Sequence, residues 1–403
     1  MFLPRLALAI ASALVVGSAA SAQEPARAIT NVTLIDGTGA PARERMTVLV
    51  VEGTIAVVAP AAQTSVPPAA HVVEGTGKFL IPGLWDMHVH LAKAGASSLG
   101  LFLANGVTSV RDLGGDFALV QQWRSEIAAG QRLGPRIRTA GPILEDPARV
   151  RRLKARGTVE PVDRFRVPVT DSADADRVVD SLARLGVDFI KARTAASPES
   201  YRAIAAAARR AGLAFAAHGD IVPPEEMLRA RQGSIEHALY PPLARRDARA
   251  RAQLIRHLVE ARVAVVPTMV NYYEWLLVSP ARARRIVEDS AGHLDPRRRY
   301  LSGYLLDDWR EQVEERGRVK DALIRRLYLP RAYRGVLRDL QEMQRAGIRI
   351  LPGTDVAVAL MYPGFSLRDE LAVLLEASAA GFQLPAARCQ RTPGVAVPPT
   401  PGP

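Results

Sequence analysis

The stretch PGLWDMHVHLA, residues 82–92, places His88 and His90 one residue apart, just after Asp86. Residues i and i+2 of a β-strand point to the same side, so two imidazole rings at this spacing can reach one divalent ion. The same spacing arises when two polar residues alternate along an ordinary strand. An H-x-H pair alone is therefore a weak indication of a metal site, and other residues must support it.

Four more chemistry-bearing side chains end short apolar segments farther along the chain. Lys191 ends GVDFIKA, His218 ends GLAFAAH, His237 ends GSIEH and Asp355 ends GIRILPGTD. Four of the seven histidines of the chain lie at such segment ends. In a closed barrel of parallel strands the carboxyl ends of all strands meet at one mouth, where active sites lie. These distant residues are therefore expected to share one pocket.

The elements that must position these residues are short strands alternating with alanine-rich amphipathic helices. Such alternation predicts a parallel sheet wrapped by helices, and eight strands suffice to close a barrel. We therefore predict the α/β class and a (β/α)8 TIM barrel over residues 82–380, with a helical, arginine-rich insertion at about 269–346. The eight predicted strands are 82–88, 106–112, 136–142, 186–192, 212–218, 233–237, 262–268 and 347–355.

Residues 23–81 have a different pattern. Short alternating, β-branched runs are separated by turn residues such as Asp36-Gly37 and Glu52-Gly53. This pattern predicts a small antiparallel β domain, sandwich-like in type, before the barrel.

Residues 1–22 have the layout of a secretory signal peptide. Arg5 supplies positive charge, an apolar run extends from Leu6 to Val16, and Ala20-Ser21-Ala22 offers a cleavage site. The apolar run is too short for a comfortable membrane span. We expect an exported bacterial protein, periplasmic or secreted, with no stable membrane span after signal removal. The single cysteine, Cys389, excludes an internal disulfide.

The chain carries a formal net charge of +12. Its arginines are spread among alanines in helix-like runs such as residues 242–262, without the interleaved aromatic residues of a nucleic-acid-binding surface. We therefore expect solvated helix faces and no nucleic-acid partner, although the charge favours acidic substrates or surfaces. A basic exported protein that acts on anionic polymers is the weakest alternative. Homo-oligomer formation is left open.

As a set, the segments of this chain resemble the amidohydrolase superfamily of metal-dependent hydrolases, in the branch of imidazolonepropionases and Xaa-Pro dipeptidases. The matching segments follow family order and cover roughly residues 28–380. They are NVTLIDGTG, GKFLIPGLWDMHVHL, NGVTSVRDLGG, GVDFIKA, AHGD, GSIEHALY, LPGTD and PGFSLRDELAVLLEA.

The resemblance implies a centre of two divalent metal ions, with zinc the expected metal. His88, His90 and Asp355 would hold one ion, and His218 and His237 the other. Two cations at the spacing of such sites repel and need an anionic bridge, which a free ammonium cannot provide. The resemblance implies that carbon dioxide carboxylates Lys191 to supply it. The alternative is a barrel-mouth lysine that binds an anionic substrate, or a loop lysine.

The resemblance also implies a reaction. A metal-bridging hydroxide would attack a carbonyl of an amide or peptide bond, with Asp355 as general base and then acid, and Lys191 supporting the centre. Tyr240 and Arg193 are candidate substrate contacts, or ordinary loop residues. Asp86 and Asp112 are expected to support the ligands or the local turn. We expect a small-molecule amide or peptide substrate, a dipeptide or N-acyl amino acid as for prolidases. A lactone or cyclic amide is the alternative.

The chain departs from the family pattern after residue 380. Relatives continue with strands that complete the small β domain, whereas residues 381–403 are proline-rich and unable to form strands. We expect a disordered tail and an incomplete β domain, by truncation or a reading-frame change. An incomplete fold also leaves open an alternative function, that of an exported protein that binds metal but is not an active enzyme.

Overall fold

The computed structural model describes residues 25–157, 160–237, 243, 246–317 and 329–377. The predicted signal peptide (1–22), the candidate substrate residue Tyr240 and the proline-rich tail (381–403) lie outside the described residues. The chain divides into two compact units, Met1–Pro82 and Gly83–Pro403.

The first unit contains one five-stranded sheet in the order β3-β2-β1-β4, with β5 also paired to β1. Strands β1 to β3 are antiparallel, as predicted, whereas β4 and β5 run parallel to β1. Glu52 and Gly53 both have positive φ (49° and 72°), the geometry that a tight β2–β3 hairpin requires. The elements are β1 (Arg27–Leu34), β2 (Arg43–Val51), β3 (Thr54–Pro60), η1 (Ala61–Gln63), β4 (His71–Glu74) and β5 (Phe79–Leu80).

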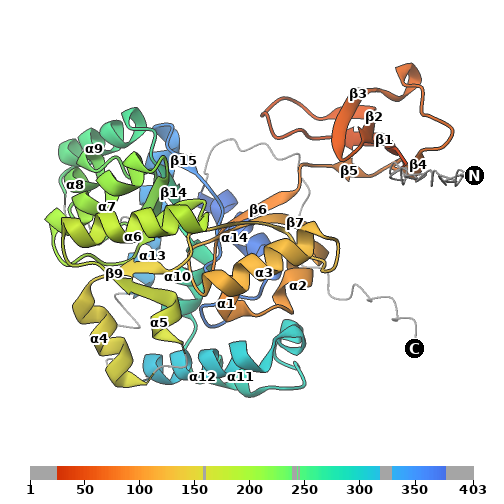
Figure 1. Ribbon diagram of the computed structural model, residues 1–403. Helices are drawn as coiled ribbons and strands as arrows, with labels where there is room; N and C mark the ends of the chain where they lie inside the picture. The colour runs from red at the N-terminus through yellow and green to blue at the C-terminus, as the bar shows by residue number, and fades with distance from the viewer. Residues whose placement is uncertain (1–24, 158–159, 238–242, 244–245, 318–328, 378–403) are drawn as a thin grey trace, which may run out of the picture. The chain divides into compact units, whose positions relative to one another are not determined.

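The second unit is a parallel barrel, and each of the eight predicted segments contains a strand (Figure 1). The strands form a three-stranded sheet, β6-β7-β8, and a seven-stranded sheet, β10-β9-β11-β12-β13-β14-β15. Their bounds are β6 (Leu84–Val89), β7 (Val107–Asp112), β8 (Arg136–Thr139), β9 (Ile143–Glu145), β10 (Arg166–Pro168), β11 (Phe189–Ala192), β12 (Ala214–His218), β13 (Ser234–Glu236), β14 (Ala264–Val266) and β15 (Arg349–Ile350).

The third barrel strand differs from its prediction over 136–142. It ends at Thr139, turns at Gly141 (φ 68°) and resumes as β9, which pairs with β11 through Leu144. Backbone hydrogen bonds join the two sheets, with Asp188 N donating to Thr139 O at one junction (2.9 Å) and Met87 N to Pro352 O at the other (2.9 Å). The ladder is thus divided, yet the strands enclose one barrel.

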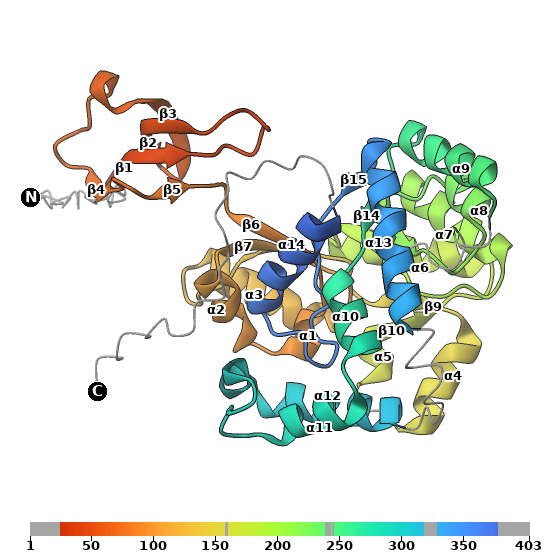
Figure 2. The same cartoon turned by 180° about the vertical axis from the view of Figure 1, so that it is seen from behind.

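Helices cover the outside of the barrel, with α6, α7, α8 and α9 along one side and α13 beside β14 and β15 (Figures 1 and 2). In α6, Ala175, Val178, Val179 and Leu182 are buried, the i, i+3, i+4, i+7 spacing of an amphipathic helix, and the Asp171 side chain caps its first turn. The first helices are α1 (Leu91–Ala94), α2 (Ser98–Ala104), α3 (Phe117–Ala128), α4 (Pro147–Arg156), α5 (Val162–Phe165), α6 (Ser172–Leu185), α7 (Pro198–Arg210), α8 (Pro224–Arg229) and α9 (Ala248–Glu260).

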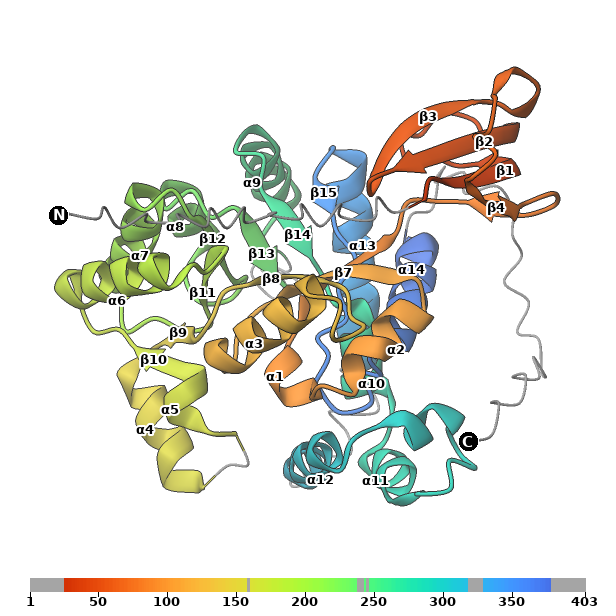
Figure 3. The same ribbon diagram turned by 45° about the vertical axis from the view of Figure 1, so that its right-hand side comes forward.

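The insertion predicted at about 269–346 is helical in its described part. Its α11 and α12 lie at the same end of the barrel as α4 and α5 (Figure 3), and an Arg156–Glu315 ion pair (3.1 Å) joins α4 to α12. The remaining elements are α10 (Met269–Leu277), α11 (Pro280–Glu288), η2 (Pro296–Tyr300), α12 (Gly303–Gly317), α13 (Leu329–Arg345) and α14 (Phe365–Ala377). Among the described helices, none has the length and apolar character that crossing a bilayer requires.

Candidate active site

The six predicted ligands lie at the carboxyl ends of barrel strands. His88 and Lys191 are near the ends of β6 and β11, and His218 is the last residue of β12. His90 lies one residue beyond β6, His237 follows β13, and Asp355 lies five residues beyond β15. Parallel strands of a barrel present these ends on one face, so the topology brings together residues up to 267 positions apart, 355 minus 88.

His88, His90 and Asp355 form the tightest group. One possible ligand atom from each lies within 4.8 Å of the others, and both histidine Nε2 atoms are 3.4 Å from Asp355 Oδ1. The other two histidines adjoin this group. The rings of His88 and His237 have centroids 4.8 Å apart, and those of His237 and His218 4.4 Å apart. The four histidines and Asp355 therefore lie together at one end of the barrel.

Each of three histidines has its Nδ1 engaged by a polar group behind it. The partners are Glu236 Oε2 for His88 (2.9 Å), the Gly114 carbonyl for His90 (2.9 Å) and Thr268 Oγ1 for His237 (2.8 Å). A carboxylate or carbonyl only accepts, so in the first two rings Nδ1–H donates and Nε2 keeps its lone pair. The rings are thereby held in the form that a metal ligand needs.

Asp86 and Asp112, which the sequence suggested for this supporting role, make other contacts. Asp86 accepts from Thr354 Oγ1 (2.6 Å) and so links β6 to the segment that carries Asp355. Asp112 accepts from Thr139 Oγ1 (2.7 Å) and from the backbone N–H of Leu91 (2.9 Å). Both carboxylates fix the backbone around the site, which is the local role that the sequence allowed, and among the described residues neither is hydrogen-bonded to a histidine ring. Burial raises the pKa of Asp86 to about 7.

Glu236 is the supporting residue that sequence reasoning missed. Its side chain is fully buried and accepts from Arg111 Nη2 (2.6 Å) and Ser234 Oγ (2.7 Å) as well as from His88. Burial opposes ionisation, but the Arg111 guanidinium outweighs it and holds the pKa of Glu236 well below its usual range. The only signal in the sequence was an acidic residue within the short apolar strand GSIEH.

Burial also sets the protonation of the histidines. It lowers the pKa of His237 to about 3 and that of His218 well below its usual value, and it lowers that of His88 despite the neighbouring Asp355 carboxylate. Neutral imidazole is the form that binds metal. Burial opposes ionisation of Asp355, yet the nearby His88 and His90 hold its pKa below the usual range. The rings of His88, His218 and His237 and the carboxylate of Asp355 are therefore available as donors at neutral pH.

Lys191 lies inside this group with its side chain 1% exposed. Its Nζ is buried and has no hydrogen-bond partner in the described part of the chain. Burial lowers the pKa of Lys191 to about 7, although the Glu236 carboxylate opposes that shift. An unpaired buried amino group is costly, and about half of a group with this pKa is neutral at pH 7.

Comparison with solved structures assigns the fold. A protein from Bifidobacterium longum with a provisional assignment as a prolidase superposes with a TM-score of 0.65 at 23% identity, over 89% of this chain and 80% of that one. A Xaa-Pro dipeptidase with bound methionine gives 0.59 at 18% identity, over 87% and 84%. The Aspergillus niger enzyme described as A. niger ochratoxinase gives 0.61 at 19%, over 88% and 80%. The chain therefore has the fold that these solved structures share.

Comparison with known sequences gives less information about this chain than comparison with solved structures. A scan against models of protein families finds no match. An adenine deaminase from Paracoccus denitrificans is 37% identical over 68 residues, which is 16% of this chain and 11% of the deaminase. The chain thus aligns with only about a tenth of the length of that curated relative, and the fold assignment depends on the structural neighbours.

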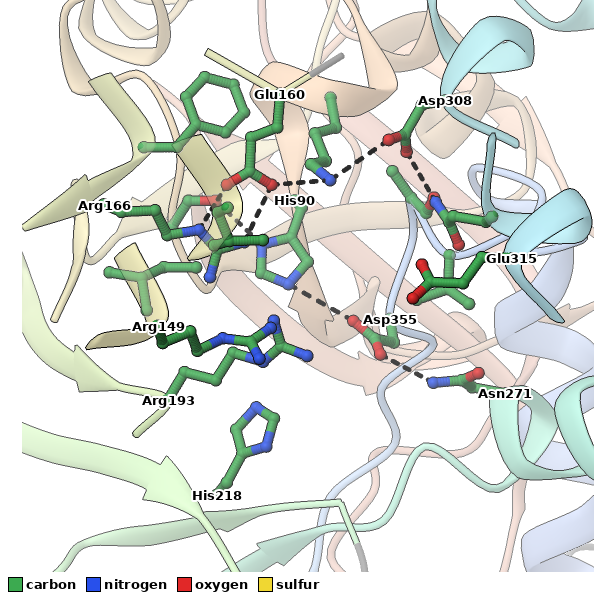
Figure 4. Close-up of a pocket in the computed structure, with 18 of the residues that line it drawn as sticks. His90, Arg149, Glu160, Arg166, Arg193, His218, Asn271, Asp308, Glu315 and Asp355 are labelled. Atoms are coloured by element: carbon green, nitrogen blue, oxygen red, sulfur yellow. Dashed lines mark hydrogen bonds and ion pairs between the residues drawn. The ribbon is translucent and has the colours of Figure 1, made fainter. Parts of the chain in front are cut away.

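The mouth of the barrel opens into a cavity of about 930 Å³. Arg193, predicted as a substrate contact, lines it, and burial lowers the pKa of Arg193 to about 10. Asn271 at the start of α10 donates to Asp355 Oδ2 (2.8 Å), a contact that the sequence gave no reason to expect (Figure 4). Asp355 is therefore held between histidines on one side and the insertion on the other.

Proposed function

We propose that the protein is a metal-dependent amidohydrolase that cleaves the amide or peptide bond of a dipeptide or N-acyl amino acid. The single observation that carries this proposal is the convergence of His88, His90 and Asp355, within 4.8 Å, with two further histidines at the mouth of an amidohydrolase-type barrel. In the proposal, His88, His90 and Asp355 hold one divalent ion, and His218 and His237 hold the second. Zinc is the metal that this nitrogen-rich donor set favours.

The donors fit such a centre in their chemistry. Burial favours the neutral imidazole of His88, His218 and His237. The rings of His88 and His90 direct Nε2 into the group because Nδ1 is occupied. Lys191 also supports a centre of two metal ions, because its Nζ is buried and has no hydrogen-bond partner among the described residues. We propose that it reacts with carbon dioxide, because only a neutral amine is a nucleophile and its pKa of about 7 provides that form. The resulting carbamate would place an anion among the four imidazoles.

When bound, the metal ions supply an acidified water and polarise the substrate carbonyl. The residues of the chain do the rest. Asp355 is ionised and anchored by Asn271, so one carboxylate oxygen can accept a proton and pass it to the leaving nitrogen. Glu236 keeps His88 in one tautomer throughout.

The test combines metal analysis with a substrate panel. Purified protein should contain about two divalent ions per chain by mass spectrometry, and it should hydrolyse members of a panel of dipeptides and N-acyl amino acids. A chelator should abolish turnover, and zinc should restore it. Bound metal with no turnover across the panel would favour the inactive metal-binding protein. Absence of tightly bound metal after zinc supplementation would contradict the proposed ligands.

A further inference from the structure

Arg193 is an unusual cation in the cavity wall. It follows β11 two residues after Lys191, so the two side chains leave the strand on the same side. No ion pair or side-chain hydrogen bond engages its guanidinium within the described residues, although it is only partly exposed. A guanidinium shielded from water without a partner is expensive in free energy, which suggests that its partner is a ligand.

Arg149, on α4, lies beside Arg193. Figure 4 shows the charged ends of the two arginines next to one another, in the space between His90 and His218. The two guanidinium groups interact electrostatically as like charges. Within the described residues, the only acidic partner of Arg149 is Glu145, whose Oε2 is 3.3 Å from its Nε. The terminal nitrogens of Arg149 are left toward the cavity.

Glu145 positions Arg149 from behind. Glu145 ends β9, is buried, and accepts hydrogen bonds from Arg166 Nη1 (2.6 Å) and Thr194 Oγ1 (2.5 Å). Its contact with Arg149 Nε is an ion pair without a hydrogen bond. A buried carboxylate shared in this way is fixed in place, so the arginine attached to it is pre-oriented. The negative charge of Glu145 is shared with Arg166, so it does not neutralise the two positive charges of Arg149 and Arg193.

Other cations of the cavity lining have acidic partners, and Arg152, which also lines the cavity, is exposed to solvent. Lys93 contacts Glu160 (2.9 Å) and Asp308 (3.4 Å), and Arg156 contacts Glu315 (3.1 Å). Two adjacent guanidinium groups present several parallel N–H donors, the geometry that binds a carboxylate in a bidentate manner. Their mutual repulsion falls when an anion lies between them.

We propose that Arg149 and Arg193 bind a free carboxylate of the substrate. This inference rests on the proposed function and assigns the residues that recognise its substrate class, because dipeptides and N-acyl amino acids carry a carboxylate near the scissile bond. Amides without a carboxylate would be poor substrates. In Figure 4 the ends of the two arginines lie near His218, on the side of Asp355 opposite to Asn271. A carboxylate bound to the arginines would therefore leave the adjoining amide between them and Asp355.

Calorimetric binding tests the inference without relying on turnover. The probes are N-acetyl-L-leucine and its amide, N-acetyl-L-leucinamide, titrated into D355N protein as purified, so that hydrolysis does not consume the ligand. The acid should bind at least tenfold more tightly than the amide. In the same background, R149Q and R193Q should each weaken binding of the acid by about 10- to 100-fold, the range for hydrogen bonds to a charged group, and leave the amide unaffected. R151Q is the matched control, an exposed arginine of the same helix outside the cavity lining, and should change neither affinity.

Kinetics on the unmodified enzyme separate this inference from the proposed function. If a substrate from the panel is hydrolysed, R193Q should raise KM for it far more than it lowers kcat. Preferential binding of the acid that depends on both arginines, with no turnover of any panel member, supports the anion site and refutes the hydrolase. Equal binding of acid and amide, or an unchanged affinity in R149Q and R193Q, overturns the inference even if hydrolysis occurs. Inorganic phosphate displacing the acid at lower concentration than acetate would overturn the choice of carboxylate.

Discussion

The E236Q substitution is the sharpest test of how the site is held together. Glu236 uses Oε1 for Arg111 and Ser234 and Oε2 for His88. Glutamine has the same size but one acceptor oxygen, so it cannot satisfy both sides. If the amide oxygen stays with Arg111, its NH₂ group faces His88 Nδ1, which must then accept. The proton of His88 moves to Nε2, the nitrogen that faces Asp355, and that nitrogen can no longer bind metal.

The magnitude has two parts. Loss of a group that orients a histidine ligand typically lowers metal affinity by about 10- to 100-fold, or about 1.4 to 2.7 kcal/mol. Arg111 also loses the charge of a fully buried carboxylate 2.6 Å away, and breaking such a buried pair costs about 3–5 kcal/mol of folding stability. E236Q retains a neutral hydrogen bond to Arg111, so we expect a loss near the lower end of that range. The partly exposed Glu126–Arg132 pair provides the matched control, E126Q, with an effect below about 1 kcal/mol.

Zinc affinity would be measured by competition with a chromophoric chelator, and stability by denaturant unfolding of the metal-free proteins. E236Q should bind zinc more weakly and unfold at lower denaturant concentration than the unsubstituted protein. E126Q should show no comparable loss of zinc affinity or stability. Zinc affinity in E236Q within twofold of the unsubstituted protein would refute the role assigned to Glu236, even if stability falls. In that case His88 would be oriented by its own packing, and the contact to Glu236 would serve folding alone.

Four further predictions follow from single residues. K191A should lose at least one of the two metal ions, and ¹³C-labelled bicarbonate should give a carbamate signal in the unsubstituted protein and none in K191A. D355N should lower kcat by about 10²- to 10⁴-fold with a bound substrate still detectable, as expected for a proton-transfer group. Burial raises the pKa of Glu370 to about 8 from 4.5, so the folded state holds its proton more tightly and stability should fall as pH rises from about 4.5 to 8. E370Q should flatten that slope in denaturant titrations at several pH values, and an unchanged slope would contradict the buried, protonated state. The mature exported protein should begin near Gln23 by N-terminal sequencing, and an intact Met1 would contradict export by this signal.

The barrel was predictable because each strand is a short apolar run with a defined end. Periodicity and turn residues are local properties of the chain, so all eight segments could be located from residue types alone. The break in the third strand was not predictable. It depends on Gly141 adopting φ 68° and on Leu144 finding a partner in β11, and the second of these is a contact between segments far apart in sequence.

The ligand candidates were predictable for a similar reason. Topology sends every strand end to one mouth, so a polar residue at a strand end is a site residue before any distance is known. The residues that support the ligands could not be recognised in this way from their positions in the sequence. Glu236 and Asn271 matter because of the atoms they touch, His88 Nδ1 and Asp355 Oδ2, and those contacts join β13 to β6 and α10 to the loop after β15. Only a three-dimensional arrangement specifies them.

The backbone gives independent support for the location of the site. His237, Thr268 and Asp355 have φ values of 65°, 48° and 64°, a region that costs a non-glycine residue of order 1–3 kcal/mol. They lie at the ends of the sixth, seventh and eighth barrel strands. Local propensity would favour glycine at all three positions, whereas the site uses an imidazole, the hydroxyl that engages it and a carboxylate. Where backbone preference and side-chain chemistry conflict in this way, a residue retained for its side chain is the economical explanation, and here the conflict recurs on three successive strands around one cavity.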